Sequence, residues 1–233
     1  MVVPIILICL GALALFWFLF EKVKAYSLKA VFLKATASLL FIALGVYAFY
    51  KTSLKVFPVF AVLALVLGLL GDIALDLKYV FKEKDYEFTM AGFIAFAIGH
   101  VLYISGMFLE FYTGQNVLYI IIPLALAALM GPGSFLLAKV SKVNYGRFKW
   151  IAFIYCMVLF GTTASAFSLW MMTGFANNGL LMLFIGGVLF AVSDLILNLT
   201  YFGEGHEKPL DIISNTVTYY AAQYIIALAI LFL

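Results

Sequence analysis

Three aspartates lie inside long runs of apolar residues in this sequence. The stretch GDIALDL contains Asp72 and Asp76, and the similar stretch SDLILNL contains Asp194 and Asn198. In each stretch the two polar side chains are four positions apart, so they share one face of a helix. An ionisable group in a membrane-spanning helix is costly and predicts a functional site, here for proton transfer or cation binding. The alternative is a side chain that only bonds a neighbouring helix or reaches nearby water, which applies most to Asp76.

Two other apolar runs also carry polar side chains. His100 is the only histidine inside a run, and Tyr103 lies close by on a neighbouring face. Tyr219 and Gln223 are four residues apart and share one helical stripe. A lone histidine is often a satisfied core residue, but because the neighbours of His100 are mostly aliphatic, we favour a role for it in lining a pocket. Tyrosines often lie in the belt at the membrane interface, and Tyr219 is too deep in its run for that.

The composition predicts an integral membrane protein. Hydrophobic residues make up 67% of the 233 residues and charged residues 11%, with a mean hydropathy of +1.16, whereas soluble domains have about 25% charged residues. A helix needs about 20 apolar residues to cross a bilayer. Eight runs are long enough: Val3–Phe20, Ala30–Tyr50, Pro58–Leu77, Phe88–Leu109, Val117–Val140, Trp150–Met172, Asn178–Leu199 and Leu210–Leu233. Since the connections are short, we expect a single all-α domain over 1–233 with eight transmembrane helices.

The basic residues predict the orientation of these helices. The first, third, fifth and seventh connections between these runs, with the adjoining helix ends, hold 12 of the 14 lysines and arginines. The other two, Lys51 and Lys55, lie in the second connection. Basic residues in short loops stay in the cytoplasm, so both termini are predicted to be non-cytoplasmic. The membrane would be the plasma or inner membrane in a bacterium and the endoplasmic reticulum in a eukaryote. The acidic turn GEGHEK at 203–208 is expected to be solvated.

The two aspartate stretches also suggest an internal repeat. Aligning Asp72 with Asp194 brings His100 beside Gln223. An even number of helices between the stretches keeps their direction, so both aspartates are expected at the same depth in the cytoplasmic half. The chain then divides into two parallel four-helix halves, about 1–110 and 111–233. Repeats of this kind often place the site at their interface.

Four motifs resemble those of the YhhN-like lysoplasmalogenase family of eight-helix membrane proteins. They are G-D at 71–72, G-x₃-F-x₃-H-x₂-Y at 92–103, S-D at 193–194 with a Phe eight residues after the Asp, and Y-Y-x₂-Q at 219–223. They occur in the family's order and cover the chain from the third apolar run to its end. The remaining apolar runs carry none of them and are expected to act as scaffold.

This resemblance implies a hydrolase that cleaves the vinyl ether bond of lysoplasmalogens to a fatty aldehyde and glycerophosphoethanolamine or glycerophosphocholine. It assigns catalysis to Asp72 and Asp194. Asp76 and Asn198 do not match the motifs, so only the shared helix faces argue for them. We expect a lysophospholipid substrate in membrane lipid, no nucleic-acid partner, and no metal or other cofactor. Residues expected to bind the substrate are Asp76, His100, Tyr103, Ser193, Asn198, Tyr219, Tyr220 and Gln223.

Two carboxylates suit this chemistry because a vinyl ether is opened by acid. As in glycoside hydrolysis, one carboxylic acid donates a proton while a second carboxylate activates water and steadies the cation. A zinc site would need at least the minimal set of Asp72, Asp194 and His100, and Ser193 lacks the context of a serine nucleophile. A proton- or cation-coupled transporter of a small solute would use the same aspartates. Against it, no Pro/Gly-interrupted helices occupy corresponding places in the two halves.

Overall fold

The computed structural model describes residues 2–203 and 208–233, so most of the predicted turn at 203–208 lies outside the described residues. The described residues form long helices and two short 3-10 turns, with no strand among them. The predicted all-α class is therefore confirmed, and the helix boundaries agree with the apolar runs to within about one turn. The long helices are α1 (Val2–Lys24), α2 (Leu28–Lys51), α3 (Phe57–Val80), α4 (Asp85–Phe111), α5 (Leu118–Val140), α6 (Lys149–Met172), α7 (Asn178–Phe202) and α8 (Pro209–Ala229).

Seven of the helices in the described part of the chain, α1 to α7, are long and apolar enough to cross a membrane. The chain is thus a multi-pass membrane protein, close to the predicted count of eight spans. Helix α8 differs because it carries a row of polar side chains, among them Asn215, Thr216, Tyr219 and Gln223. Three of these four are buried. The polar side chains of α8 therefore face the interior of the bundle, where they contribute to the site described below.

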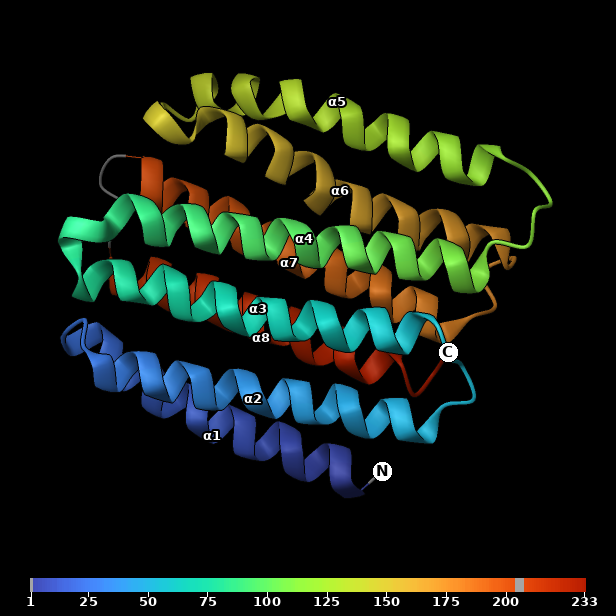
Figure 1. Cartoon of the computed structure of the whole chain (residues 1–233), viewed down its shortest axis with the longest axis horizontal. Coiled ribbons are helices and arrows are strands. Elements are labelled where there is room, and N and C mark those ends of the chain that lie inside the picture. Colours follow the sequence, from blue (N-terminus) through green and yellow to red (C-terminus); the bar gives the residue numbers. More distant parts are fainter. Residues whose placement is uncertain (1, 204–207) are drawn as a thin grey trace.

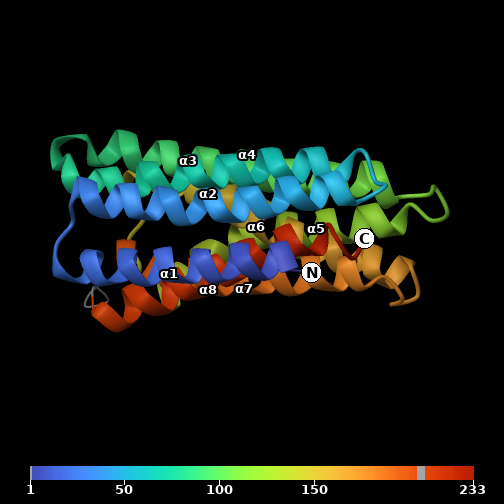
Figure 2. The ribbon, with the colours of Figure 1, turned by 90° about the horizontal axis from the view of Figure 1, so that it is seen from below.

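The helices run side by side in two main layers (Figures 1 and 2). Helices α2, α3 and α4 form one layer, and α1, α8 and α7 form the other. Helix α6 closes one edge by packing against α4 and α7, with α5 outside it. The connections α1–α2 and α3–α4 lie at one end of the bundle, and both termini lie at the opposite end (Figure 1). We call the first of these the loop end; its cytoplasmic orientation stays a prediction, as does the division into half-repeats.

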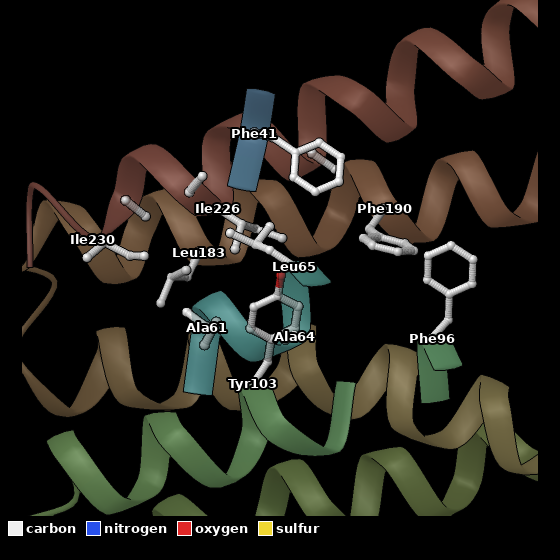
Figure 3. Packing of buried hydrophobic residues seen from close by; sticks show 14 of the residues in the cluster. Phe41, Ala61, Ala64, Leu65, Phe96, Tyr103, Leu183, Phe190, Ile226 and Ile230 are labelled. Atoms are coloured by element: carbon white, nitrogen blue, oxygen red, sulfur yellow. The ribbon is translucent and has the colours of Figure 1, made fainter. Parts of the chain in front are cut away.

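The core between the layers is packed with aromatic and aliphatic side chains. Phe96 of α4 and Phe190 of α7 point toward each other across the layers (Figure 3), with ring centroids 6.0 Å apart. Tyr219 of α8 completes the cluster, 5.8 Å from Phe96 and 5.3 Å from Phe190. A Cβ at Gly71 would lie 2.5 Å from the Phe96 ring, so the ring can pack here because the G-D motif has a glycine at this position. The aromatic cluster borders the polar end of the core.

Candidate active site

A polar pocket opens between the layers toward the loop end. Helices α1, α2, α3, α7 and α8 supply most of its lining, which includes both predicted catalytic aspartates. Asp72 comes from the second half of α3 and Asp194 from the second half of α7, two helices that are distant in sequence. We call this cavity the polar pocket; its polar lining includes Lys22, Lys34, Asp72, Ser193, Asp194 and Asn215.

Asp72 is surrounded by groups that stabilise a negative charge. Its side chain is nearly inaccessible, with 2% exposure. The ammonium of Lys34 lies 3.3 Å from Oδ1. The hydroxyls of Ser38 and Tyr219 donate hydrogen bonds of 2.7 and 3.0 Å to Oδ2. A carboxylate with a cation and two hydroxyl donors is compensated for the loss of its hydration, so Asp72 is equipped to be held as an anion.

Asp76 belongs to the same charged cluster. It lies one turn from the end of α3, yet its exposure is only 4%. The Lys22 ammonium donates a 2.5 Å hydrogen bond to Oδ1, and Lys34 lies 3.6 Å from the same oxygen. The alternative that Asp76 only reaches nearby water does not apply, because its carboxylate pairs with lysines of α1 and α2. Its predicted contact with substrate stays a prediction. We call Lys22, Lys34, Asp72 and Asp76 the charge cluster; it neutralises two buried anions with two cations.

Asp194 has a different environment. It is half-buried, and the hydroxyl of Tyr155 on α6 donates a hydrogen bond to Oδ2. Across the described ranges no lysine, arginine or histidine forms an ion pair with it, whereas Asp72 pairs with Lys34 and Asp76 pairs with both Lys22 and Lys34. The two aspartates thus share a pocket but differ in charge compensation.

Ser193 connects α7 to α8 beside this aspartate. Its hydroxyl donates to the backbone oxygen of Asn215 at 3.0 Å, and the Asn215 amide donates back to the Ser193 carbonyl at 2.8 Å. Reciprocal bonds of this kind fix the register between the two helices. Ser193 therefore holds the helix that carries Asp194, and its hydroxyl is already engaged. Its predicted contact with substrate stays a prediction.

A chain of hydrogen bonds leads from Asp72 deeper into the bundle. Gln223 donates a 2.9 Å bond to the Tyr219 hydroxyl, and Tyr103 donates a 3.5 Å bond to the Gln223 carbonyl. A Cβ at Gly68 would lie 2.7 Å from the Gln223 amide nitrogen, so glycine is required for this approach. The helical stripe predicted on α8 is therefore real, and it orients the Tyr219 hydroxyl toward Asp72.

Tyr220 is linked to Asp72 through the hydroxyl of Ser38. Its hydroxyl forms hydrogen bonds of 2.8 Å with Ser38 and 3.1 Å with the backbone oxygen of Lys34. Both partners belong to α2, so Tyr220 joins α8 to the helix that supplies the cation of Asp72. It positions the charge cluster and is not part of the polar pocket's lining.

His100 does not line the polar pocket. It is 2% exposed, and its Nδ1 lies 3.0 Å from the Thr162 hydroxyl. With Tyr103 and Gln223 it borders a separate small cavity. The Phe190 ring contacts both the imidazole and the Tyr219 ring. Its centroid lies 4.7 Å from that of His100 and 5.3 Å from that of Tyr219. The Nε2 of His100 has no hydrogen-bond partner among the described residues.

Asn198 lines a second, mostly apolar depression on the far side of Asp194. We call it the apolar groove; its lining includes Leu137 of α5, Leu159 and Phe160 of α6, and Leu195 of α7. Asn198 lies beside Tyr145, in the connection before α6. Burial raises the pKa of the Tyr145 hydroxyl, and the Asn198 side chain partly offsets this rise. Asn198 thus lines a different cavity from Lys22, Lys34 and Asp72.

The sequence interpretation missed several residues of the site. The distribution of basic residues assigns Lys34 and Lys22 to the neighbourhood of a loop, although Lys34 lies inside a predicted span. That position was a usable signal, and Ser38 follows it one turn later on the same helix face. Tyr155 and Asn215 carried no signal of comparable strength, because single Tyr and Asn residues are common near helix ends.

Within the described residues, no group of three His, Cys, Asp or Glu side chains is close enough to hold a metal ion. A protein-family model described as the YhhN family matches residues 29–230, which includes α2 with Lys34 and Ser38. No match was found among curated proteins or among solved structures.

Proposed function

The chain belongs to the YhhN family, and from this premise we propose that it is a lysoplasmalogenase-type hydrolase of ether lipids. The reaction would cleave the vinyl ether bond of a lysoplasmalogen to a fatty aldehyde and glycerophosphoethanolamine or glycerophosphocholine. The single observation that carries the proposal is that Asp72 and Asp194 line one polar pocket inside a membrane domain. Two carboxyl groups in one pocket are the minimum that acid–base hydrolysis of such an ether needs.

The different surroundings of the two aspartates support a division of roles. Asp72, beside Lys34 and two hydroxyl donors, acts as the carboxylate that activates water. Asp194, which the described residues provide with one hydroxyl partner and no ion pair, acts as the acid. An adjacent cation favours the ionised form of a carboxyl group, and its absence leaves the proton available.

The proposed reaction balances without a further reagent. Asp194 donates its proton to the alkene carbon that is not bonded to oxygen, and an oxocarbenium ion forms. Asp72 removes a proton from water as the water oxygen bonds to the cationic carbon, giving a hemiacetal. Asp194 then takes the hemiacetal hydroxyl proton while Asp72 protonates the departing glycerol oxygen. Aldehyde and alcohol are released, and both carboxyl groups return to their starting states.

Aldehyde release by the purified protein in detergent tests this proposal. We expect a 1-alkenyl lysophospholipid to yield a fatty aldehyde, because the alkene accepts the proton. The matched 1-alkyl lysophospholipid has the same head group and chain length but no double bond, so it should remain intact. Detergent solution has no sealed compartments, so a transporter would give no signal. Absence of aldehyde from well-folded protein, over a range of head groups, would contradict the proposal.

A further inference from the structure

The polar pocket and the apolar groove meet at Asp194. Both cavities are lined by Asp194, Leu197 and Tyr201, all on α7. On one side of these residues lie the charge cluster and Asn215. On the other side lie Leu159 and apolar neighbours of α5 and α6. The boundary between the charged compartment and the mostly apolar one is therefore formed by these three residues, of which Asp194 alone carries a carboxyl group.

The apolar groove opens toward the membrane. Leu137 and Leu195 line it and are 41% and 42% exposed, whereas Leu159 at its inner side is 4% exposed. In a multi-pass protein an exposed apolar surface on spanning helices faces lipid. Along α6 the lining runs from Ala152 to Phe160, which corresponds to about 12 Å of helix. The groove is thus long enough to take several methylene groups and open enough to let a longer chain continue into lipid.

We propose that the apolar groove binds the hydrocarbon chain of the substrate while the polar pocket takes its glycerophosphate head. This inference rests on the proposed function for the identity of the substrate. A lysoplasmalogen is charged at one end and apolar at the other, and its vinyl ether joins the two parts. Only a molecule that crosses the Asp194 boundary fills both cavities at once. In that position the ether lies beside the carboxyl group that donates the proton.

The head-group side offers matching chemistry. Lys22 and Lys34 line the polar pocket together with Thr216, which carries a hydroxyl group. Ammonium groups and neutral donors are the groups that bind phosphate and glycerol oxygens. The cluster's two carboxylates balance the two cations, so the attraction for a phosphate is moderate and product can leave. The groove itself carries no cation among its lining in the described ranges, which argues against the reversed orientation of a lysophospholipid.

The first test narrows the groove at its exposed rim. Leu137→Trp places a larger side chain in the groove, and Leu136→Trp is the matched control, because Leu136 is the adjacent α5 residue, is 66% exposed and does not line the groove. Hexadecenyl and butenyl lysophospholipids are compared by kcat/KM. We expect Leu137→Trp to lower the ratio of kcat/KM for the hexadecenyl substrate to kcat/KM for the butenyl substrate about tenfold. Each methylene group that the groove no longer buries lowers substrate binding several-fold. Leu136→Trp should keep the wild-type ratio.

A second readout does not require turnover. A 1-alkyl lysophospholipid carrying a diazirine at mid-chain is photolysed with the whole protein, and the labelled peptides are mapped. Label on the α6 segment around Cys156 and Leu159, lost in Leu137→Trp and competed by unlabelled lysolipid, supports the chain site. If that label appears but no aldehyde is ever released, the proposed function fails and the chain site stands. Aldehyde release with an unchanged chain-length ratio and label only on other lipid-facing helices would overturn the inference.

Discussion

The two aspartates of the polar pocket illustrate how similar sequences acquire different chemistry. On the α1–α3 side, Asp72 is part of a cluster in which Lys22 and Lys34 offset two carboxylates. On the α6–α7 side, Asp194 has the Tyr155 hydroxyl as its partner and an apolar groove behind it. Both residues follow a small residue near the loop end of a long helix. The difference arises from neighbouring helices, which supply cations on one side and aromatic side chains on the other.

The largest expected effect comes from removing either carboxyl group. Asp194→Asn and Asp72→Asn should each lower aldehyde release by a factor of about 100 or more, because an amide keeps the volume but cannot transfer the proton. The two variants should differ in stability: Asp194→Asn should melt at or above the wild-type temperature, whereas Asp72→Asn should melt lower because Lys34 loses a partner. The measurements are initial rates and thermal unfolding in detergent.

Asp76→Asn is the control for this pair. It should be active, because Asp76 does not line the polar pocket, and its main effect should be lower stability through the loss of the Lys22 ion pair. An inactive Asp76→Asn together with a fully active Asp194→Asn would show that the aspartates of α3 alone form the site.

Removal of the central cation is expected to have the next largest effect. Lys34→Met leaves Asp72 and Asp76 with Lys22 as their one charged partner in the cluster, and breaking a buried ion pair costs about 3–5 kcal/mol. The matched control is Lys29→Met on the same helix, whose side chain is 62% exposed and pairs with Glu21. Denaturant or thermal unfolding should separate the two variants. Equal stability of Lys34→Met and Lys29→Met would argue against a buried charge cluster.

On the Asp194 side of the pocket, Tyr155→Phe should lower the rate of aldehyde release less than Asp194→Asn does. It removes the hydroxyl that donates to Asp194 and leaves the ring in place, so the rate should fall by about tenfold, the equivalent of one hydrogen bond. Stability should change little. Tyr50→Phe, at a residue that is 77% exposed, is the control for loss of a tyrosine hydroxyl. A loss of activity as large as that of Asp194→Asn would give Tyr155 a direct part in the proton transfer.

The smallest effects are expected beyond the aromatic cluster. His100 borders the separate cavity behind Phe190, so His100→Ala should reduce kcat by less than about tenfold, mainly through loosened packing. Gln223→Ala should act similarly, because it orients the Tyr219 hydroxyl and does not line the polar pocket. Steady-state kinetics measure both. A loss of about 100-fold or more with normal folding would place either residue in the chemical step.

Much of the fold could be predicted because it depends on local composition. The apolar runs specified the long helices, and their bounds differ from the observed ones mainly at the loop end, where α1 continues to Lys24 and α3 to Val80. Past its apolar run, α1 carries Lys22, which pairs with Asp76 of α3 inside the bundle. The sequence could not indicate this, since hydropathy treats each charge separately.

The sequence by itself determined that the chain forms long membrane helices and that Asp72, Asp194, His100 and Gln223 are unusual within them. Hydrophobic length and polar interruptions are properties of the chain alone. Only the tertiary structure decided which of these residues share a cavity: it joined Asp72 to Lys34 and Asp194 to Tyr155, and it set His100 apart behind Phe190. The physical reason is that a buried charge is compensated by partners from other helices, and their choice depends on how the helices pack.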